Sequence, residues 1–300
     1  MSRTRITRRT PVLTAGALVA AAALAVAGCA PATSSGQSAA AGSSSGATTA
    51  AACTPANLKT KTANTLTIAT DEPVYEPWFV ADKPTNKKGF EGAVAYAVAE
   101  KLGYTDSQVT WVRAHFDNVI SPAPKKFDFD INEFSITDAR KKVVDFSTGY
   151  YDVTQAVVTV KGSKIAGDTT LAALKSAKLG AQKGTTSYDV IGSVIKPSQS
   201  PAVFNTNDLA VQALKNHQID GLVVDLPTAL YVAAAQVKDG VVLGQFGSPG
   251  TPEQFGLLLE KASPVTDCVS KAVDALRSDG TLKQLETQWL TDSAGAPVLK

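Results

Sequence analysis

The chain has 300 residues, with 29 basic and 27 acidic side chains, two histidines and three cysteines. Four of the basic residues are arginines among the first nine positions, so the remainder holds 25 basic against 27 acidic side chains. That balance argues against nucleic-acid binding, and the two isolated histidines, His115 and His217, offer no zinc site. The length beyond residue 58 suits two modest domains.

The first 28 residues have the layout of an export signal. A basic start precedes the apolar run 12–27, which falls short of the ~20 residues of a membrane span. Small residues come before Cys29 in LAVAGC, which resembles the lipobox of bacterial lipoproteins, whose cysteine is acylated. An ordinary secretory cleavage site is the alternative. We therefore expect a signal peptide over 1–28 and an exported protein, lipid-anchored through Cys29 at the outer face of the cytoplasmic membrane.

Residues 29–57 are mostly Ala, Ser, Gly, Thr and Pro. Such a segment buries too little apolar surface to offset its ordering entropy, so we expect a flexible tether. The two remaining cysteines, Cys53 and Cys268, can form a disulfide in an exported protein, with two unrelated thiols as the alternative. A bridge would join the start of the folded region to a C-terminal helix.

Strands and helices alternate in the first half of the folded region. The pattern predicts strands at 65–70, 108–114, 127–134 and 155–160. Between them it predicts a helix over 89–103, a short helix near 116–120, and a helical turn from Thr137.

The same alternation continues to the C-terminus. We predict strands at 178–182, 202–206, 219–225, 241–246 and 253–260, and helices at 171–177, 187–195, 208–217, 227–236, 265–280 and 281–290. This order indicates two α/β units on mostly parallel sheets. In such sheets ligands bind beyond the carboxyl ends of the strands.

The stretch FDFDINEFSITDAR, residues 127–140, begins like a calcium loop, with Asp128, Asp130 and Asn132 at alternate positions. An EF-hand needs glycine at position six and glutamate at position twelve, whereas this chain has Glu133 and Ala139 there. We therefore predict no metal site and no cofactor.

Arg140 lies in the first turn of a predicted helix, where a cation opposes the helix dipole. An anion beside it would resolve that conflict, and guanidinium suits a carboxylate. The anion is either a ligand or a nearby acid such as Asp138 or Asp145.

The segment SITDARKKVVDFSTGYY, residues 135–151, resembles the motif of amino-acid-type solute-binding proteins of ABC importers, and the likeness extends over residues 64–291. The resemblance implies a two-lobed Venus-flytrap fold of the periplasmic-binding-protein type II. Lobe 1 would comprise 58–155 and 246–292, lobe 2 would comprise 156–245, and 293–300 would be a tail. Two crossover strands, near 155–160 and 241–246, would form the hinge.

The same resemblance assigns roles in a ligand pocket. Arg140, with Ser135 and Thr137, would hold an α-carboxylate, helped by the helix start at Thr185 and Thr186. A plain helix cap is the alternative for the two threonines.

Asp225 ends a buried strand and would bind the α-ammonium, or else cap the next helix. Tyr75, or Trp78 as second choice, would stack on the ligand side chain, unless these aromatics pack in the core.

Glu133 departs from the family pattern, which has a small residue there. With Asp71 it would make the side-chain end of the pocket acidic and suit a cationic or amide side chain. Pairing of Glu133 with a lysine is the alternative.

The resemblance therefore implies a monomeric, lipid-anchored binding protein that captures a free amino acid and delivers it to a membrane permease. One alternative is an enzyme on the same fold, dehydratase-like or peptidoglycan-cleaving, with Glu133 as general acid; we expect Arg140 to lower the pKa of Glu133, which argues against that role. A ligand-sensing extracellular module is the other.

Overall fold

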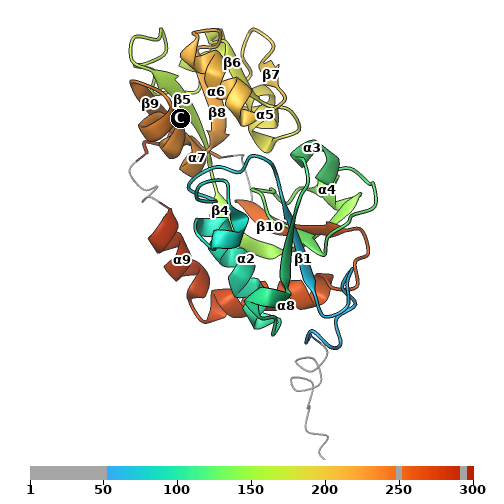
Figure 1. Ribbon diagram of the computed structural model, residues 1–300. Coiled ribbons are helices and arrows are strands. Elements are labelled where there is room, and N and C mark those ends of the chain that lie inside the picture. Colours follow the sequence, from blue (N-terminus) through green and yellow to red (C-terminus); the bar gives the residue numbers. More distant parts are fainter. Residues whose placement is uncertain (1–52, 248–251, 291–295) are drawn as a thin grey trace, which may run out of the picture. The chain divides into compact units, whose positions relative to one another are not determined.

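The computed structural model describes residues 53–247, 252–290 and 296–300. The predicted signal peptide, Cys29 and most of the predicted tether lie outside these residues. The described chain forms two five-stranded sheets, each covered by helices, which confirms the two-lobed α/β fold (Figure 1). We call the sheet with β1 and its helices lobe 1, and the sheet with β5 and its helices lobe 2.

The sheet of lobe 1 is built from both ends of the described chain. Its strands follow the order β2 (Val109–Arg113), β1 (Leu66–Thr70), β3 (Phe129–Asp130), β10 (Glu253–Glu260) and β4 (Val144–Val153). The strand β1 runs parallel to β2 and β3, whereas β10 is antiparallel to β3 and β4.

The sheet of lobe 2 has a matching order, β7 (Ala202–Phe204), β6 (Leu179–Gln182), β8 (Gly221–Asp225), β5 (Gln155–Val160) and β9 (Gly240–Phe246). Strand β6 is parallel to β7 and β8, and β5 is antiparallel to β8 and β9. In each sheet four strands run in the same direction, as expected, and one runs against them: β10 in lobe 1 and β5 in lobe 2. Each sheet is therefore mixed.

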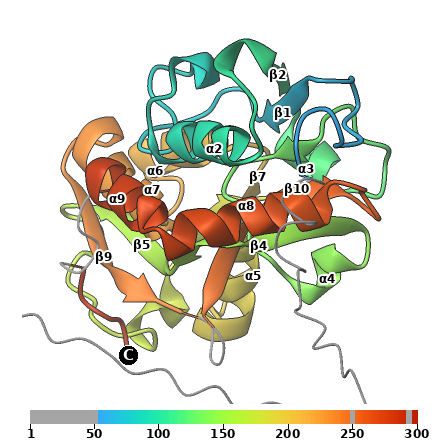
Figure 2. The ribbon, with the colours of Figure 1, turned by 90° about the horizontal axis from the view of Figure 1, so that it is seen from below.

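Three helices pack on one face of the lobe 1 sheet: α2 (Phe90–Lys101), α8 (Thr266–Ser278) and α9 (Thr281–Trp289) (Figures 1 and 2). Their apolar residues recur every three or four positions, as Phe90, Val94 and Val98 do in α2, and all three are fully buried. Two short helices, α3 (Phe116–Val119) and α4 (Asp138–Lys141), follow the carboxyl ends of β2 and β3.

Helices cover both faces of the lobe 2 sheet. One face packs against α6 (Asn207–Lys215) and α7 (Leu226–Tyr231), the other against α5 (Thr186–Val190). Both α5 and α7 continue into a π-helical turn, at Ile191–Ile195 and Val232–Gln236. Short 3₁₀ helices occur at Pro84–Asn86, Asp106–Gln108 and Ala173–Ser176, and the last replaces the helix expected over 171–177.

The predicted disulfide is present: Cys53 and Cys268 are bonded, with Cα atoms 5.4 Å apart. The bridge fastens the start of the described chain to α8 in lobe 1. Within the described residues, none of the helices has the length and apolar character that crossing a membrane requires.

Candidate functional site

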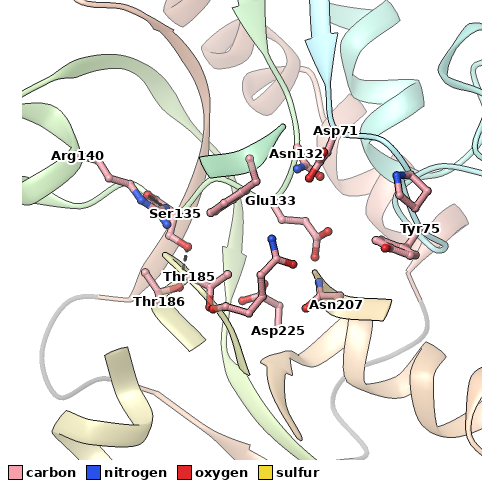
Figure 3. Close-up of a pocket in the computed structure, with 13 residues that line it drawn as sticks. Asp71, Tyr75, Asn132, Glu133, Ser135, Arg140, Thr185, Thr186, Asn207 and Asp225 are labelled. Carbon is pink, nitrogen blue, oxygen red and sulfur yellow. Dashed lines mark hydrogen bonds between the residues drawn. The ribbon is translucent and has the colours of Figure 1, made fainter. Parts of the chain in front are cut away.

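A cavity lies where loops of the two lobes meet (Figure 3). Lobe 1 contributes residues that follow β1 and β3, and lobe 2 contributes residues at or after the ends of β6, β7 and β8. This is the edge where parallel strands end, as the α/β pattern predicts. Eight of the predicted site residues line the cavity: Asp71, Tyr75, Glu133, Ser135, Arg140, Thr185, Thr186 and Asp225.

Arg140 is the arginine of the cavity wall and is only 8% exposed. Its Nη1 donates to the carbonyl oxygen of Ser135 at 2.7 Å, and its Nη2 donates to that of Gly184, in lobe 2, at 2.9 Å. The guanidinium lies 5.5 Å from the centre of the Phe116 ring. Burial lowers the pKa of Arg140 from its usual value. A guanidinium has five N–H donors, so these two bonds leave donors for an anion.

Thr137 has a different position from the one expected. It is the N-cap of α4, where its hydroxyl accepts a hydrogen bond from the amide of Arg140 at 3.2 Å, and it does not line the cavity. It therefore shapes the turn that carries Arg140.

Thr185 and Thr186 begin α5 on the lobe 2 side of the cavity. Thr185 caps the helix by accepting from the amide of Tyr188 at 3.1 Å. Thr186 donates to Glu253 Oε1 at 2.5 Å, and its hydroxyl lies 3.1 Å from that of Ser135 (Figure 3). Thr186 has one hydroxyl proton, so Ser135 is the donor in the second bond, which links the two lobes.

Asp225 ends β8 and does not cap α7 with its side chain. Its Oδ1 instead accepts from Gln155 Nε2 at 2.7 Å, and the same nitrogen lies 3.1 Å from Glu253 Oε2. Burial, and next the charge of Glu253, raise the pKa of Asp225 well above its usual range. A cation in the cavity would therefore stabilise this carboxylate.

Glu133 lies in the left-handed backbone region, with φ of 51°. Its amide donates to Glu91 Oε1 at 2.6 Å, and its Oε2 accepts from the hydroxyl of Thr228, on α7 of lobe 2, at 2.8 Å. Burial raises the pKa of Glu133 well above its usual range, followed by the charges of Glu91 and Asp225. The expectation that Arg140 lowers this pKa is wrong, because burial and neighbouring carboxylates dominate.

Trp78 lies in the core of lobe 1, 1% exposed, rather than in the cavity wall. Its ring packs edge-on against Phe90, Tyr151 and Phe255. Its Nε1 donates to the hydroxyl of Thr228 at 2.7 Å, so it supports the threonine that holds Glu133.

Tyr75 and Asp71 line the cavity at the side away from Arg140 (Figure 3). Burial raises the pKa of Tyr75, as does the carboxylate of Asp208, in lobe 2. Asp71 Oδ1 lies 3.2 Å from Nδ1 of His115 and accepts from the amide of Glu72 at 2.7 Å.

Several residues of the site were not singled out from the sequence. Those that line the cavity are Pro73, Phe116, Asn132, Gln182 and Asn207. Gln182 is the last residue of β6, and Asn207 begins the helix after β7, so the rule of strand ends would have found both. Gln155, the first residue of β5, donates to Asp225 and also to Glu253, the first residue of β10, and no pattern in the sequence pointed to either residue.

Residues 66–292 match the family of bacterial extracellular solute-binding proteins, family 3. The chain therefore belongs to this family of binding proteins.

Among curated relatives, the chain is 30% identical to a probable histidine-binding protein of Campylobacter jejuni subsp. jejuni, over 75% of this chain and 84% of that protein. Among solved structures, it resembles an ancestral arginine-binding protein bound to glutamine, with 31% identity, a TM-score of 0.62, and coverage of 75% of this chain and 97% of the other.

It also resembles AncCDT-1, an ancestral amino acid-binding protein described as a precursor of cyclohexadienyl dehydratase. That likeness has 29% identity and a TM-score of 0.62, and covers 76% of this chain and 95% of the other.

Proposed function

We propose that this protein is the substrate-binding component of an ABC importer and captures a free amino acid with a cationic side chain. One observation carries the choice of ligand: three carboxylates, Asp71, Glu133 and Asp225, line the cavity together with one arginine, Arg140. A zwitterionic amino acid brings one charge of each sign. Once Arg140 meets its carboxylate and one acid meets its ammonium, two acids remain, and a side-chain cation would offset one of their two charges.

The positions in the cavity support a division of roles (Figure 3). Arg140, Ser135, Thr185 and Thr186 lie together and would bind the α-carboxylate through charge-assisted hydrogen bonds. Asp225 lies nearby and would bind the α-ammonium.

The ligand side chain would then extend past Glu133 toward Asp71 and Tyr75. Burial of two acids without a cation is unfavourable, which is why an uncharged or acidic side chain would fit this end less well. The histidine-binding relative and the ancestral arginine-binding protein named above support the same class of ligand.

We propose further that Cys29 carries lipid and holds the protein at the outer face of the cytoplasmic membrane. The sequence LAVAGC supports this anchor, and membership in an extracellular family supports export.

The likeness to a dehydratase precursor, together with the raised pKa of Glu133, supports an enzyme as the second candidate. The hydrogen bond from Thr228 uses Oε2 of Glu133 and leaves Oε1 able to carry a proton, so this contact does not argue against a general acid. Membership in a family of solute-binding proteins, together with an arginine in the cavity wall that suits a ligand carboxylate, supports binding as the first candidate.

Calorimetric titration of the mature protein with each of the twenty amino acids tests the proposal. We expect arginine, lysine or histidine to bind most tightly. We expect Glu133→Gln to weaken that binding about tenfold or more, since a charge pair is lost, and to change glutamine binding much less. Glu72→Gln, an exposed acid of the loop after β1, is the matched control and should bind like the parent.

Preference for glutamate or aspartate would overturn the choice of ligand. Turnover of a bound compound that disappears in Glu133→Gln, followed by mass spectrometry, would favour the enzyme.

A further inference from the structure

The C-terminal residues 296–300 return to lobe 2 after the chain has completed α9 in lobe 1. Figures 1 and 2 both show the C-terminus beside β9. These residues lie beyond 66–292, the part of the chain that matches the family. We call residues 296–300 the tail.

Main-chain hydrogen bonds attach the tail to β9, the edge strand of its sheet. The amide of Gln245 donates to Pro297 at 2.7 Å, and the amide of Leu299 donates back to Gln245 at 2.9 Å. At the tail's end, the amide of Leu171 donates to Lys300 at 2.9 Å. The tail therefore extends the sheet by a short strand and satisfies edge groups that would otherwise face solvent.

Side-chain packing adds to this attachment. Leu299 is 3% exposed and belongs to the apolar cluster of lobe 2 that includes Leu174, Leu243 and Phe246, whereas its neighbour Val298 is 62% exposed. Gly244 makes the approach possible, because a Cβ atom there would lie 2.5 Å from the carbonyl oxygen of Pro297. The absence of a side chain at Gly244 of β9 therefore leaves room for the tail.

Gln245 also connects the tail to the hinge. Its Nε2 donates to the carbonyl oxygen of Ala296 at 2.9 Å, and its Oε1 accepts from the hydroxyl of Thr154 at 2.9 Å. Thr154 joins β4 to β5, so it is the crossover from lobe 1 to lobe 2. One side chain thereby holds the first crossover, the last strand of lobe 2 and the tail together.

We propose that the tail is a third connection between the lobes and limits how far they open. The chain already crosses between lobes at Thr154 and between β9 and β10. Only five residues separate Leu290 from Ala296, and six Cα–Cα steps span at most roughly 20 Å. While the tail stays on β9, the C-terminal end of α9 cannot move farther than that from lobe 2.

Two variants of the mature, ligand-free protein test this proposal: Leu299→Ser, and a chain that ends at residue 295. Val298→Ser is the matched control, since it makes a similar change on an exposed neighbour. Hydrogen exchange reports whether the tail is attached, through the amide of Gln245, and small-angle X-ray scattering reports how far the lobes open.

We expect the Gln245 amide to exchange at least about tenfold faster in both test variants, since a buried leucine is lost, and the radius of gyration to increase. The control should match the parent in both measurements. An unchanged Gln245 amide, or an unchanged radius of gyration in the shortened chain, would overturn the proposal. If Leu299→Ser does not fold, the two measurements on the shortened chain alone test the proposal. The ligand does not enter the experiment, so its result is independent of the proposed substrate.

Discussion

Glu91 is fully buried and does not line the cavity, but it hydrogen-bonds to Glu133, which does. Its Oε1 accepts hydrogen bonds from the amide of Glu133 and from the hydroxyl of Tyr150. The first of these bonds fastens the backbone of Glu133, whose left-handed conformation costs a non-glycine residue about 1 kcal/mol. Burial raises the pKa of Glu91 to about 7, although both hydrogen bonds oppose that shift.

The raised pKa predicts a pH dependence of stability. Folding disfavours the charged form of Glu91, so the folded protein binds more protons than the unfolded chain between about pH 4.5 and 7. The contribution of this group to the free energy of unfolding therefore falls as pH rises through that window, by up to ~3 kcal/mol. In Glu91→Gln that fall should be absent, while the amide oxygen of the substituted side chain can still accept both bonds. Thermal unfolding at a series of pH values would show a flatter profile for the variant, and parallel profiles would contradict the prediction.

At the scale of the residue, the sequence predicted which loops form the cavity wall better than which side chains of those loops line it. Arg140 and Asp225 were identifiable because a cation at a helix start and an acid at a strand end both need a partner. Trp78 and Thr137 were misplaced, since nothing in a loop sequence tells which of several neighbouring side chains faces the core. The contacts of Glu133 with Thr228 and Glu91 join residues 95 and 42 positions apart, which no local pattern reveals.

At the scale of the element, α7 of lobe 2 contacts lobe 1 through Thr228. This hydroxyl accepts from Trp78 and donates to Glu133, and it is 4% exposed. Both bonds form only when the lobes are together, so they stabilise the closed form over the open one.

Thr228→Val keeps the shape of the side chain and removes both bonds. It leaves the indole N–H of Trp78 buried and unpaired, at a cost of about 1–3 kcal/mol. We expect the affinity for the amino-acid ligand to fall roughly tenfold, as measured by calorimetry. Thr287→Val, the same change at an exposed site of α9, serves as the control, and a loss below about twofold in Thr228→Val would argue against this role.

Most elements were predictable from apolar periodicity, but strand β4 and the short 3₁₀ helices were not. Strand β4 was missed, because its irregular apolar pattern and interior Gly149 conceal a strand whose partner, β10, begins a hundred residues later. The helix expected over 171–177 is a 3₁₀ turn with one buried side chain, Leu174. Good helix formers do not make a long helix where so little surface is buried.

At the scale of the whole molecule, the resemblance implied two lobes, and the structure has them. The mixture of parallel and antiparallel strands was not predictable, since β10 pairs with strands more than a hundred residues away. The residue limits of the lobes stay a prediction.

The disulfide joins Cys53 and Cys268, which are 215 residues apart, and so closes a long loop of the unfolded chain. Replacing both cysteines by alanine should lower the free energy of unfolding by roughly 2–5 kcal/mol, since the unfolded chain regains freedom. Denaturation in guanidinium chloride measures this loss. Ligand affinity should stay unchanged, because neither cysteine lines the cavity, and a parallel loss of affinity would contradict the prediction.

The same disulfide affects how a pulling force on the N-terminal segment is transmitted to the folded protein. A pull on the chain ahead of Cys53 divides between the main chain that follows Cys53 and the disulfide to α8, and both Leu58 and α8 pack in the core of lobe 1. The crossovers and the tail, which join the lobes, lie outside that line of force. The lobes of a protein anchored through its N-terminal segment would therefore open and close as freely as those of the same protein in solution.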